Sequence, residues 1–270
     1  MTNALFRLDG QTAVVTGACG KLGPVWAEAL LHAGARVAAL ELAGALESEA
    51  YRAVALHAGD RLSRFDCDVT SRVSIERAVE SLVREMGEPG VLVNNAGVDQ
   101  PPDSGGNRSR IEDWPADQFR RMVEVNLLGT FQVTQVIGGG MAARGAGSVV
   151  NIGSLYASVS PDQRFYDHLS GTLPFLKSPA YGASKAAVVN MTAYFATLWG
   201  KLGVRVNTLS PGGVMAGQDE QFTDKYCARV PLGRMAHSDD LRGPLVFLAS
   251  SASSYVSGHE LRVDGGFTAW

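Results

Sequence analysis

Short apolar runs alternate with longer stretches of helical spacing along this chain, and this alternation limits the folds open to it. Runs so short suit strands that are buried on both faces of a sheet. Stretches such as 73–86 and 180–201 carry apolar residues at the spacing of a helix face. Alternating strands and helices imply parallel strands joined by right-handed crossovers, so the sequence predicts a doubly wound α/β fold. The predicted strands are 13–15, 37–40, 91–93, 148–152, 204–209 and 260–263.

We expect one Rossmann-type domain over residues 1–270, with a central parallel sheet flanked by helices. The 270 residues are 46% hydrophobic and 19% charged, an ordinary composition for a globular protein with a substantial core. No internal repeat or low-complexity linker marks a domain boundary. Irregular segments interrupt the alternation at 99–114, at an insertion near 158–179 and at a lid near 213–231. Such segments in a compact domain are usually functional or disordered.

Charge and cysteine content exclude several classes of function. The net charge is −3 without a basic block, which disfavours nucleic acid or an anionic membrane as the main partner. The three cysteines are odd in number and widely spaced, which predicts reduced thiols and neither a disulfide framework nor a metal site. The first residues lack a signal-peptide pattern, and no apolar stretch reaches the length of about 18 residues that a membrane helix needs. A cytoplasmic protein is expected.

A glycine-rich turn at 16–23 directly follows the first predicted strand and precedes a helical stretch. In this context glycines permit a tight turn and close helix–strand packing, here at Gly17 and Gly23. The helix N-terminus would then face a pyrophosphate with free N–H groups and the positive end of its dipole. Strings of this kind are common, so the turn alone leaves a purely structural role open.

The second predicted strand ends at Glu41, 18 residues beyond Gly23. A carboxylate there can accept hydrogen bonds from both ribose hydroxyls and repel a 2′-phosphate, which favours NAD. Lys21 could approach a 2′-phosphate, so NADP stays possible. The alternative for Glu41 is a solvated strand end.

Two further polar groups follow strand-like stretches. Asp68 can accept a hydrogen bond from adenine, or it can cap the helix that begins near Val73, although Thr70 or Ser71 would serve better as a cap. The small residues at 94–97 would let the backbone approach a ligand closely.

Tyr181 and Lys185 lie four residues apart on a predicted helix, so their side chains share one face. A nearby ammonium stabilises phenolate and lowers the pKa of a tyrosine from its ordinary value of about 10. A phenol tuned in this way can exchange a proton with a substrate oxygen. The same spacing also occurs by chance on amphipathic helices.

These strings resemble, in order and spacing, those of the short-chain dehydrogenase/reductase family, in its branch of single-domain oxidoreductases. The resemblance covers nearly the whole chain. It is carried by the turn at 16–23, Asp68-Val69, 94–97, Asn126, Ser154, Tyr181 with Lys185, Pro211-Gly212 and the tail 263–266.

The resemblance implies four catalytic residues. Tyr181 would be the general acid/base, and Ser154 would bind the substrate oxygen. Lys185 would lower the Tyr181 pKa and hydrogen-bond the nicotinamide ribose, and Asn126 would hold a water that links Lys185 to solvent. Ser154 could instead be a small residue at a strand end, and Asn126 a kink or capping residue. The implied cofactor-binding residues are Gly17, Gly20, Lys21, Leu22, Gly23, Glu41, Asp68, Val69, Asn95, Ala96, Gly97, Tyr181, Lys185, Pro211, Gly212 and Val214.

The chain departs from the family pattern in three places. Lys21 stands where the family has its second turn glycine, which falls one position earlier at Gly20. Ala216 replaces a frequent threonine whose hydroxyl binds the carboxamide, which leaves only backbone contacts near Val214. Ser154 and Tyr181 are 27 positions apart, more than the family norm, and the insertion near 158–179 accounts for the excess.

The insertion is polar, and we expect its middle to lie over or beside the substrate pocket. Arg164, His168 and Lys177 are the candidate substrate contacts. A steroid or fatty-acyl pocket would need a more apolar lining. A polyhydroxylated substrate is therefore favoured, such as a sugar, sugar acid or sugar phosphate, although the insertion could also be a solvated surface or a subunit contact.

The predicted function is reversible hydride transfer between NAD(H) and a secondary alcohol or ketone. The alternatives are an NADPH-dependent ketoreductase, a non-catalytic nucleotide-sensing regulator on the same fold, and a sugar-nucleotide epimerase or dehydratase. Only 85 residues follow Lys185, fewer than the C-terminal substrate domain of the last class usually requires. The apolar helix 180–201 and the aromatic tail 267–270 predict a homotetramer, with a dimer as the alternative.

Overall fold

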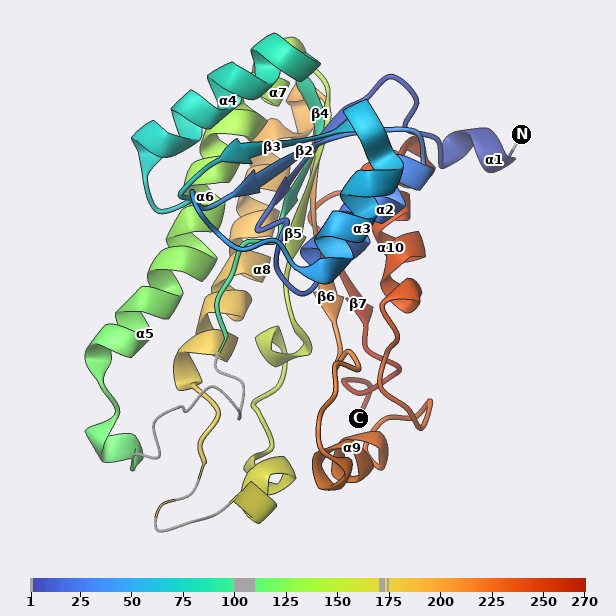
Figure 1. Ribbon diagram of the computed structural model, residues 1–270. Coiled ribbons are helices and arrows are strands. Elements are labelled where there is room, and N and C mark those ends of the chain that lie inside the picture. The colour runs from blue at the N-terminus through green and yellow to red at the C-terminus, as the bar shows by residue number, and fades with distance from the viewer. Residues whose placement is uncertain (1, 100–109, 170–172, 174) are drawn as a thin grey trace.

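A parallel sheet of seven strands forms the centre of the fold in the computed structural model, which describes residues 2–99, 110–169, 173 and 175–270 (Figure 1). The strand order is β3-β2-β1-β4-β5-β6-β7, and every pairing is parallel. The doubly wound prediction is confirmed. The strands are β1 (Thr12–Thr16), β2 (Arg36–Glu41), β3 (Leu62–Asp66), β4 (Pro89–Asn94), β5 (Gly147–Ile152), β6 (Val204–Pro211) and β7 (Glu260–Val263).

Helices cover both faces of this sheet, on its two sides in Figure 1. Neighbouring residues of β1 alternate between two hydrophobic clusters: Ala13 and Val15 pack on one side and Val14 on the other. The first side carries α2 (Gly23–His32), α3 (Glu49–Ala58) and α10 (Asp239–Ala249). The second carries α4 (Arg72–Met86), α8 (Pro179–Trp199) and the helical run α5 (Ala116–Val123), η3 (Glu124–Gly129), α6 (Thr130–Val133), η4 (Thr134–Gly138) and α7 (Gly139–Arg144), in which η3 and η4 are π-helical.

Helix ends follow the expected capping chemistry. The Ser71 hydroxyl accepts a hydrogen bond from the Ser74 amide and begins α4, so Asp68 is not the cap of this helix. Ser178 begins α8 in the same way through the Ala180 amide. The remaining short helices are α1 (Thr2–Leu5), η1 (Gly59–Arg61), η2 (Ile111–Asp113), η5 (Leu155–Ala157), η6 (Gln163–Leu169), η7 (Gly200–Leu202), α9 (Glu220–Cys227) and η8 (Ser251–Ser253).

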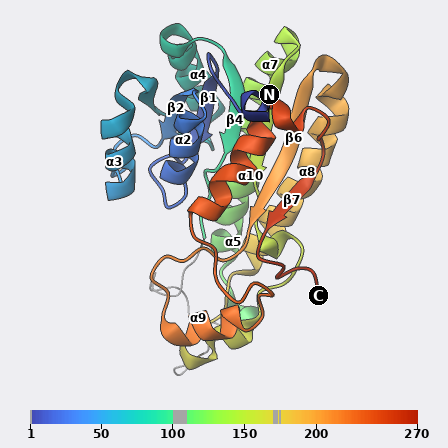
Figure 2. The ribbon, with the colours of Figure 1, turned by 90° about the vertical axis from the view of Figure 1, so that its right-hand side faces the viewer.

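A third hydrophobic cluster lies beyond the carboxyl end of the sheet, where η6 of the insertion packs against α9 (Figure 2). The Phe165 ring contacts Phe222 and Tyr226 edge-on, with centroids 6.1 and 5.7 Å apart. The C-terminal Phe267 ring stacks on Tyr226 at 5.0 Å. The insertion is therefore packed against α9 and the C-terminal tail.

Polar contacts join the same two segments. His168 Nε2 lies 2.8 Å from Asp219 Oδ1 at the start of α9, and Asp167 pairs with Lys225 within α9. None of the helices in the part of the chain that the structure describes is long and apolar enough to span a membrane.

Candidate functional site

A cavity of about 700 Å³ lies at the carboxyl ends of β1, β2, β4, β5 and β6. The strand order reverses between β1 and β4, and ligands bind at such switch points in open α/β sheets. The volume is in the range of pockets for cofactor-sized molecules. Of the residues predicted to bind cofactor, the lining contains Gly17, Gly20, Lys21, Leu22, Glu41, Asp68, Val69, Asn95, Ala96, Gly97, Tyr181, Lys185, Pro211, Gly212 and Val214.

The glycine turn is shaped by close backbone approaches. Gly17 has a φ of +61°, and a Cβ atom there would lie 2.8 Å from Ala96 Cα. A Cβ atom on Gly23 would lie 2.3 Å from the Ala18 carbonyl oxygen. Gly23 thus packs α2 against the turn and lies outside the lining, whereas Gly20 and Lys21 face the cavity.

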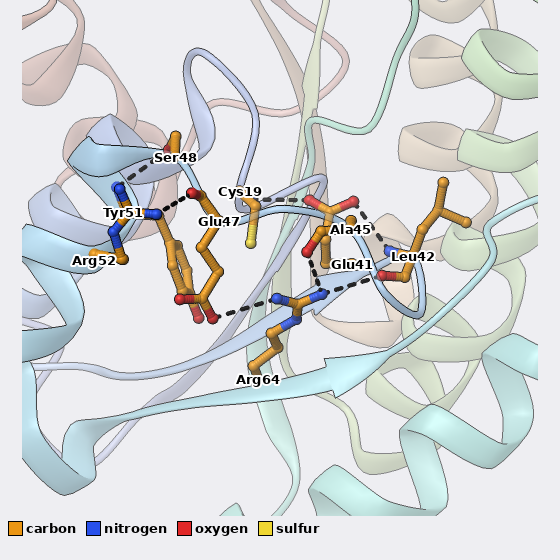
Figure 3. A network of polar contacts seen from close by, with 9 residues as sticks. All are labelled: Cys19, Glu41, Leu42, Ala45, Glu47, Ser48, Tyr51, Arg52 and Arg64. Atoms are coloured by element: carbon orange, nitrogen blue, oxygen red, sulfur yellow. Dashed lines mark hydrogen bonds and ion pairs between the residues drawn. The ribbon is translucent and has the colours of Figure 1, made fainter.

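Glu41 is held under this turn by two backbone amides (Figure 3). Its Oε2 accepts a hydrogen bond from the Cys19 amide at 2.9 Å, and its Oε1 accepts one from the Leu42 amide at 3.0 Å. A carboxylate offers about four acceptor positions, so further hydrogen bonds from a ligand remain possible. Burial raises the pKa of the Cys19 thiol to about 11, with a further contribution from Glu41, so this cysteine stays protonated.

Arg64 of β3 organises the loop after Glu41, a role that the sequence analysis missed. Its guanidinium donates to the carbonyl oxygens of Leu42 at 3.1 Å and Ala45 at 3.0 Å, and to Glu47 Oε1 at 3.3 Å (Figure 3). The feature that could have indicated this role is the charged side chain of Arg64 within β3, the strand that pairs with the one ending at Glu41.

Asp68 lies at the same end of the cavity, with Val69 and Thr70 beside it. Its Oδ1 accepts hydrogen bonds from the Thr70 amide at 2.9 Å and from the Thr70 hydroxyl at 2.7 Å. These hydrogen bonds fix the Asp68 carboxylate just beyond the carboxyl end of β3.

Asn95 ties the end of β4 to the glycine turn. Its Nδ2 donates to the carbonyl oxygens of Thr16 and Gly17 at 3.0 and 2.9 Å, and its Oδ1 accepts from Trp26 Nε1 at 2.8 Å. The Thr16 hydroxyl in turn accepts from the Asn95 and Ala96 amides. These hydrogen bonds hold the backbone after β4 beside the glycine turn, where Asn95, Ala96 and Gly97 line the cavity.

Tyr181 and Lys185 project from the first turns of α8 into the inner end of the cavity. Lys185 is buried, and its Nζ donates to the Ile152 carbonyl oxygen at 2.8 Å. The same Nζ lies 5.8 Å from the centre of the Tyr181 ring. Ser154 lies just beyond β5 and lines the cavity together with Tyr181, and its Oγ accepts a hydrogen bond from the Tyr156 amide at 3.2 Å. Three predicted catalytic groups therefore converge.

Asn126 is fully buried in the π-helical stretch η3. Its amide bonds both backbone groups of Val98, at 2.8 Å to the N–H and 3.0 Å to the carbonyl. A Cβ atom on Gly97 would lie 3.2 Å from Asn126 Oδ1 and 3.6 Å from Lys185 Nζ. The side chains of Asn126 and Lys185 therefore both lie close to Gly97. The hydrogen bonds of Asn126 to Val98 hold the segment after β4 in place.

Burial dominates the proton affinities of the two reactive groups. Burial raises the pKa of Tyr181, and the Asp99 carboxylate raises that pKa further. The Ser154 hydroxyl lowers it in part. Burial lowers the pKa of Lys185 to about 8, against the influence of Asp99. The net direction for Tyr181 is opposite to the lowering expected from the sequence, because loss of phenolate hydration is the largest influence on its pKa.

The predicted substrate contacts of the insertion separate into two groups. The Arg164 side chain is 83% exposed and pairs with Asp162, and His168 faces Asp219 on α9. None of the three predicted contacts lines the cavity, and η6 directs Arg164 to solvent and His168 to the start of α9. Lys177 is buried, and its Nζ lies 2.6 Å from Asp99 Oδ2 and 5.5 Å from the centre of the Tyr181 ring.

Asp99 and Arg121 also line the cavity and were missed by the sequence analysis. The available signal for Asp99 was its position two residues after Gly97, at the carboxyl end of a buried strand. At the opposite wall Val214 forms a single bridge with Ala236, and Ala216 offers no side-chain donor.

Comparisons with known proteins match nearly the whole chain. A family model described as "Enoyl-(Acyl carrier protein) reductase" matches residues 17–268. The D-threitol dehydrogenase of Mycolicibacterium smegmatis is 35% identical over 271 residues, which cover 97% of this chain and 95% of that protein.

Two solved structures extend the comparison. A gluconate 5-dehydrogenase from Burkholderia cenocepacia in complex with NADP and tartrate superposes with a TM-score of 0.85 at 29% identity, covering 100% of both chains. A short-chain dehydrogenase from Leptospira borgpetersenii with bound NAD⁺ gives a TM-score of 0.83 at 32% identity, covering 99% of this chain and 96% of the other.

Proposed function

This chain belongs to the short-chain dehydrogenase/reductase family and is an NAD(P)-dependent oxidoreductase acting on CH–OH groups; we propose that it transfers hydride between NAD(H) and a secondary alcohol or ketone of a polyhydroxylated, sugar-like substrate. The observation that carries this proposal is the convergence of Ser154, Tyr181 and Lys185 at the inner end of the cavity whose outer end contains the glycine turn and Glu41. The residues proposed to bind the cofactor and the residues proposed to transfer the proton therefore line the same cavity.

The proposed roles follow from this geometry. When bound, NAD⁺ supplies the hydride acceptor. Tyr181, as phenolate, takes the proton of the substrate hydroxyl while the carbon loses hydride, and it returns that proton in the reductive direction. Ser154 donates a hydrogen bond to the same substrate oxygen. The Lys185 ammonium is positioned to stabilise phenolate and to bind a ribose hydroxyl, while Asn126 beside it would hold a water that links it to solvent.

Glu41 supports the preference for NAD. A 2′-phosphate near this carboxylate would place like charges together, whereas ribose hydroxyls can donate to it. Because Glu41 is fixed by the Cys19 and Leu42 amides, it cannot easily turn away. Lys21 lines the same cavity and is the group that would favour NADP.

Polar groups at the reactive end support a polyhydroxylated substrate. Asp99 and Arg121 join Ser154 in the lining, and each can hydrogen-bond hydroxyl groups. The relatives include enzymes named for threitol, arabinitol and galactitol and others named for gluconate. Neutral polyols and sugar acids are therefore the substrate classes to test.

The competing functions predict different results. A nucleotide-sensing regulator would not need Ser154, Tyr181 and Lys185 brought together. The relative covered to 95% of its length is named as a dehydrogenase, which favours a dehydrogenase over an epimerase or dehydratase.

The test is a turnover screen of polyols, sugar acids and sugar phosphates with NAD and with NADP, followed through the absorbance of the reduced cofactor. Turnover of a polyol or sugar acid with NAD supports the proposal. Reduction of ketones by NADPH alone indicates the ketoreductase, and tight nucleotide binding without any turnover indicates the regulator.

The proposed assembly is a homotetramer, with a dimer as the alternative. Val188, Phe195 and Trp199 of α8 enter the core of the subunit, whereas Tyr194 is 63% exposed and Leu198 is also exposed on the outer face of this helix. An apolar outer face supports a subunit contact. In the aromatic tail, Phe267 is buried within the subunit, but Trp270 remains 73% exposed.

A further inference from the structure

We propose that Asp99, held in place by Lys177, accepts a hydrogen bond from the hydroxyl group next to the carbon that is oxidised, so that the enzyme selects vicinal diols over simple secondary alcohols. This inference rests on the proposed function and adds a specificity-determining residue to it. Asp99 would contact the substrate, and Lys177 would be a positioning residue.

Lys177 is anchored relative to the reacting groups. Its backbone N–H donates to Gln163 Oε1 at 3.2 Å, and the next residue, Ser178, caps the helix that carries Tyr181. Its side chain is only 6% exposed, and its Nζ donates to Asp99 Oδ2 at 2.6 Å. The ion pair therefore joins the end of the insertion to the segment after β4 at a fixed place beside Tyr181.

A buried ammonium next to a reactive phenol indicates function more than stability. Taking two charges out of water costs about as much as their attraction returns, so such pairs are weak evidence for a stabilising role. Charge pairs in a cleft beside reactive groups are instead candidates for functional sites. Here the burial is unequal, since the Asp99 side chain is 40% exposed and faces the cavity.

Asp99 lines the same cavity as the proposed acid/base, and Lys177 lies behind it beside the Tyr181 ring. Lys177 Nζ lies 5.5 Å from the centre of the Tyr181 ring and also contacts Asp99. Asp99 is close enough to raise the pKa of both Tyr181 and Lys185. A substrate oxygen held by Ser154 and Tyr181 would therefore lie in the cavity that the Asp99 carboxylate also lines.

Hydroxyl recognition follows from the chemistry of this carboxylate. An ionised carboxylate only accepts hydrogen bonds, and Lys177 occupies part of that capacity at Oδ2. A hydroxyl on the adjacent carbon can donate to the remaining positions, whereas a simple alcohol has no such group. Loss of a hydrogen bond to a charged group corresponds to about ten- to hundredfold in kcat/KM.

The experiment compares 2,3-butanediol, a vicinal diol, with 2-butanol, which lacks the second hydroxyl, both with NAD. We expect the wild type to prefer the diol, and Asp99→Asn to lower the ratio of kcat/KM for the diol to kcat/KM for 2-butanol by about ten- to hundredfold, with each enzyme measured on the plateau of its own pH profile. The KM for NAD should stay unchanged. Equal preference in wild type and variant would overturn the inference alone. A wild type inactive on both alcohols and on every polyol would overturn the proposed function, and this inference with it.

Two further variants separate recognition from folding. Asp99→Asn leaves Lys177 buried without its partner carboxylate, so the double variant Asp99→Asn/Lys177→Met removes both charges and should lose diol preference equally. Lys177→Arg should retain much of the preference, since it keeps a cation beside Asp99. Asp167→Asn removes the carboxylate of another lysine pair, outside the cavity, and should leave the preference intact. A loss of preference in this control equal to that of Asp99→Asn would assign the effect to the fold and overturn the inference.

Discussion

The Lys185 ammonium lies 5.8 Å from the centre of the Tyr181 ring while donating a hydrogen bond to a main-chain carbonyl at the end of β5. One turn of helix thus brings a buried cation beside a phenol, and the end of a strand fixes its direction. The first prediction tests the phenol.

Replacement of Tyr181 by phenylalanine keeps the ring and removes the proton carrier. We expect kcat to fall by at least about 10², the usual scale of acid–base catalysis, with NAD affinity largely retained. Steady-state kinetics and a titration with NAD measure the two quantities. Tyr194→Phe, at an exposed position of the same helix, is the control and should change neither kcat nor NAD affinity. Near-normal turnover of Tyr181→Phe would remove this residue from the mechanism.

Cofactor preference depends on Glu41. We expect the wild type to have a higher kcat/KM with NAD than with NADP, and Glu41→Ala to narrow that ratio because it removes the charge that repels a 2′-phosphate. Glu49→Ala, at an exposed carboxylate nearby on α3, should leave the ratio unchanged. A wild type that uses NADP better would show that Lys21 or another cation dominates.

The pH dependence of alcohol oxidation tests the electrostatics around Tyr181. Oxidation needs phenolate, so a raised pKa places the rise in kcat at higher pH. Asp99→Asn removes a negative charge that raises this pKa, so the rise should move to lower pH. Profiles of kcat at saturating substrate measure the shift, with Asp167→Asn as an unshifted control. No shift, or one to higher pH, would contradict the assignment. The groups around the Tyr181 phenol are Asp99, Ser154, Tyr156, Lys177 and Lys185.

The insertion should act through its aromatic contacts with the lid. Phe165→Ala removes a buried ring that packs against α9, and we expect a loss of about 3–5 kcal/mol in unfolding free energy together with a higher substrate KM. Arg164→Ala changes an exposed side chain and should alter neither. Denaturant unfolding and kinetics on the best polyol measure both effects. A fully active and stable Phe165→Ala variant would mean that the insertion does not support the lid.

Assembly can be tested on the outer face of α8. We expect light scattering at micromolar concentration to give the mass of a tetramer or a dimer, and Leu198→Glu to shift it toward monomer because a charge would replace an apolar contact. Leu56→Glu, at another exposed leucine on α3, is the control. A wild-type monomer would defeat the proposed assembly.

Local spacing was enough to predict six of the seven strands, the glycine turn and the Tyr181–Lys185 pair, whereas the edge strand β3 was not among the predicted strands. Buried parallel strands demand short apolar runs, a turn that approaches other backbone demands glycine, and side chains four apart on a helix must share a face. These rules involve residues close in sequence, so they can be applied without coordinates. These rules could not predict that the pKa of Tyr181 is raised, because burial of this residue depends on every segment that covers the site.

Only the tertiary structure decided which distant polar groups meet. Asp99 and Lys177 are 78 positions apart, and Arg64 bonds a loop about twenty positions before it. A charged side chain can pair with many partners of opposite sign, so the sequence leaves its choice open. Packing determines which partners meet. The aromatic rings around Phe165 hold η6 against α9, so Arg164 and His168 point away from the cavity and Lys177 lies beside Tyr181.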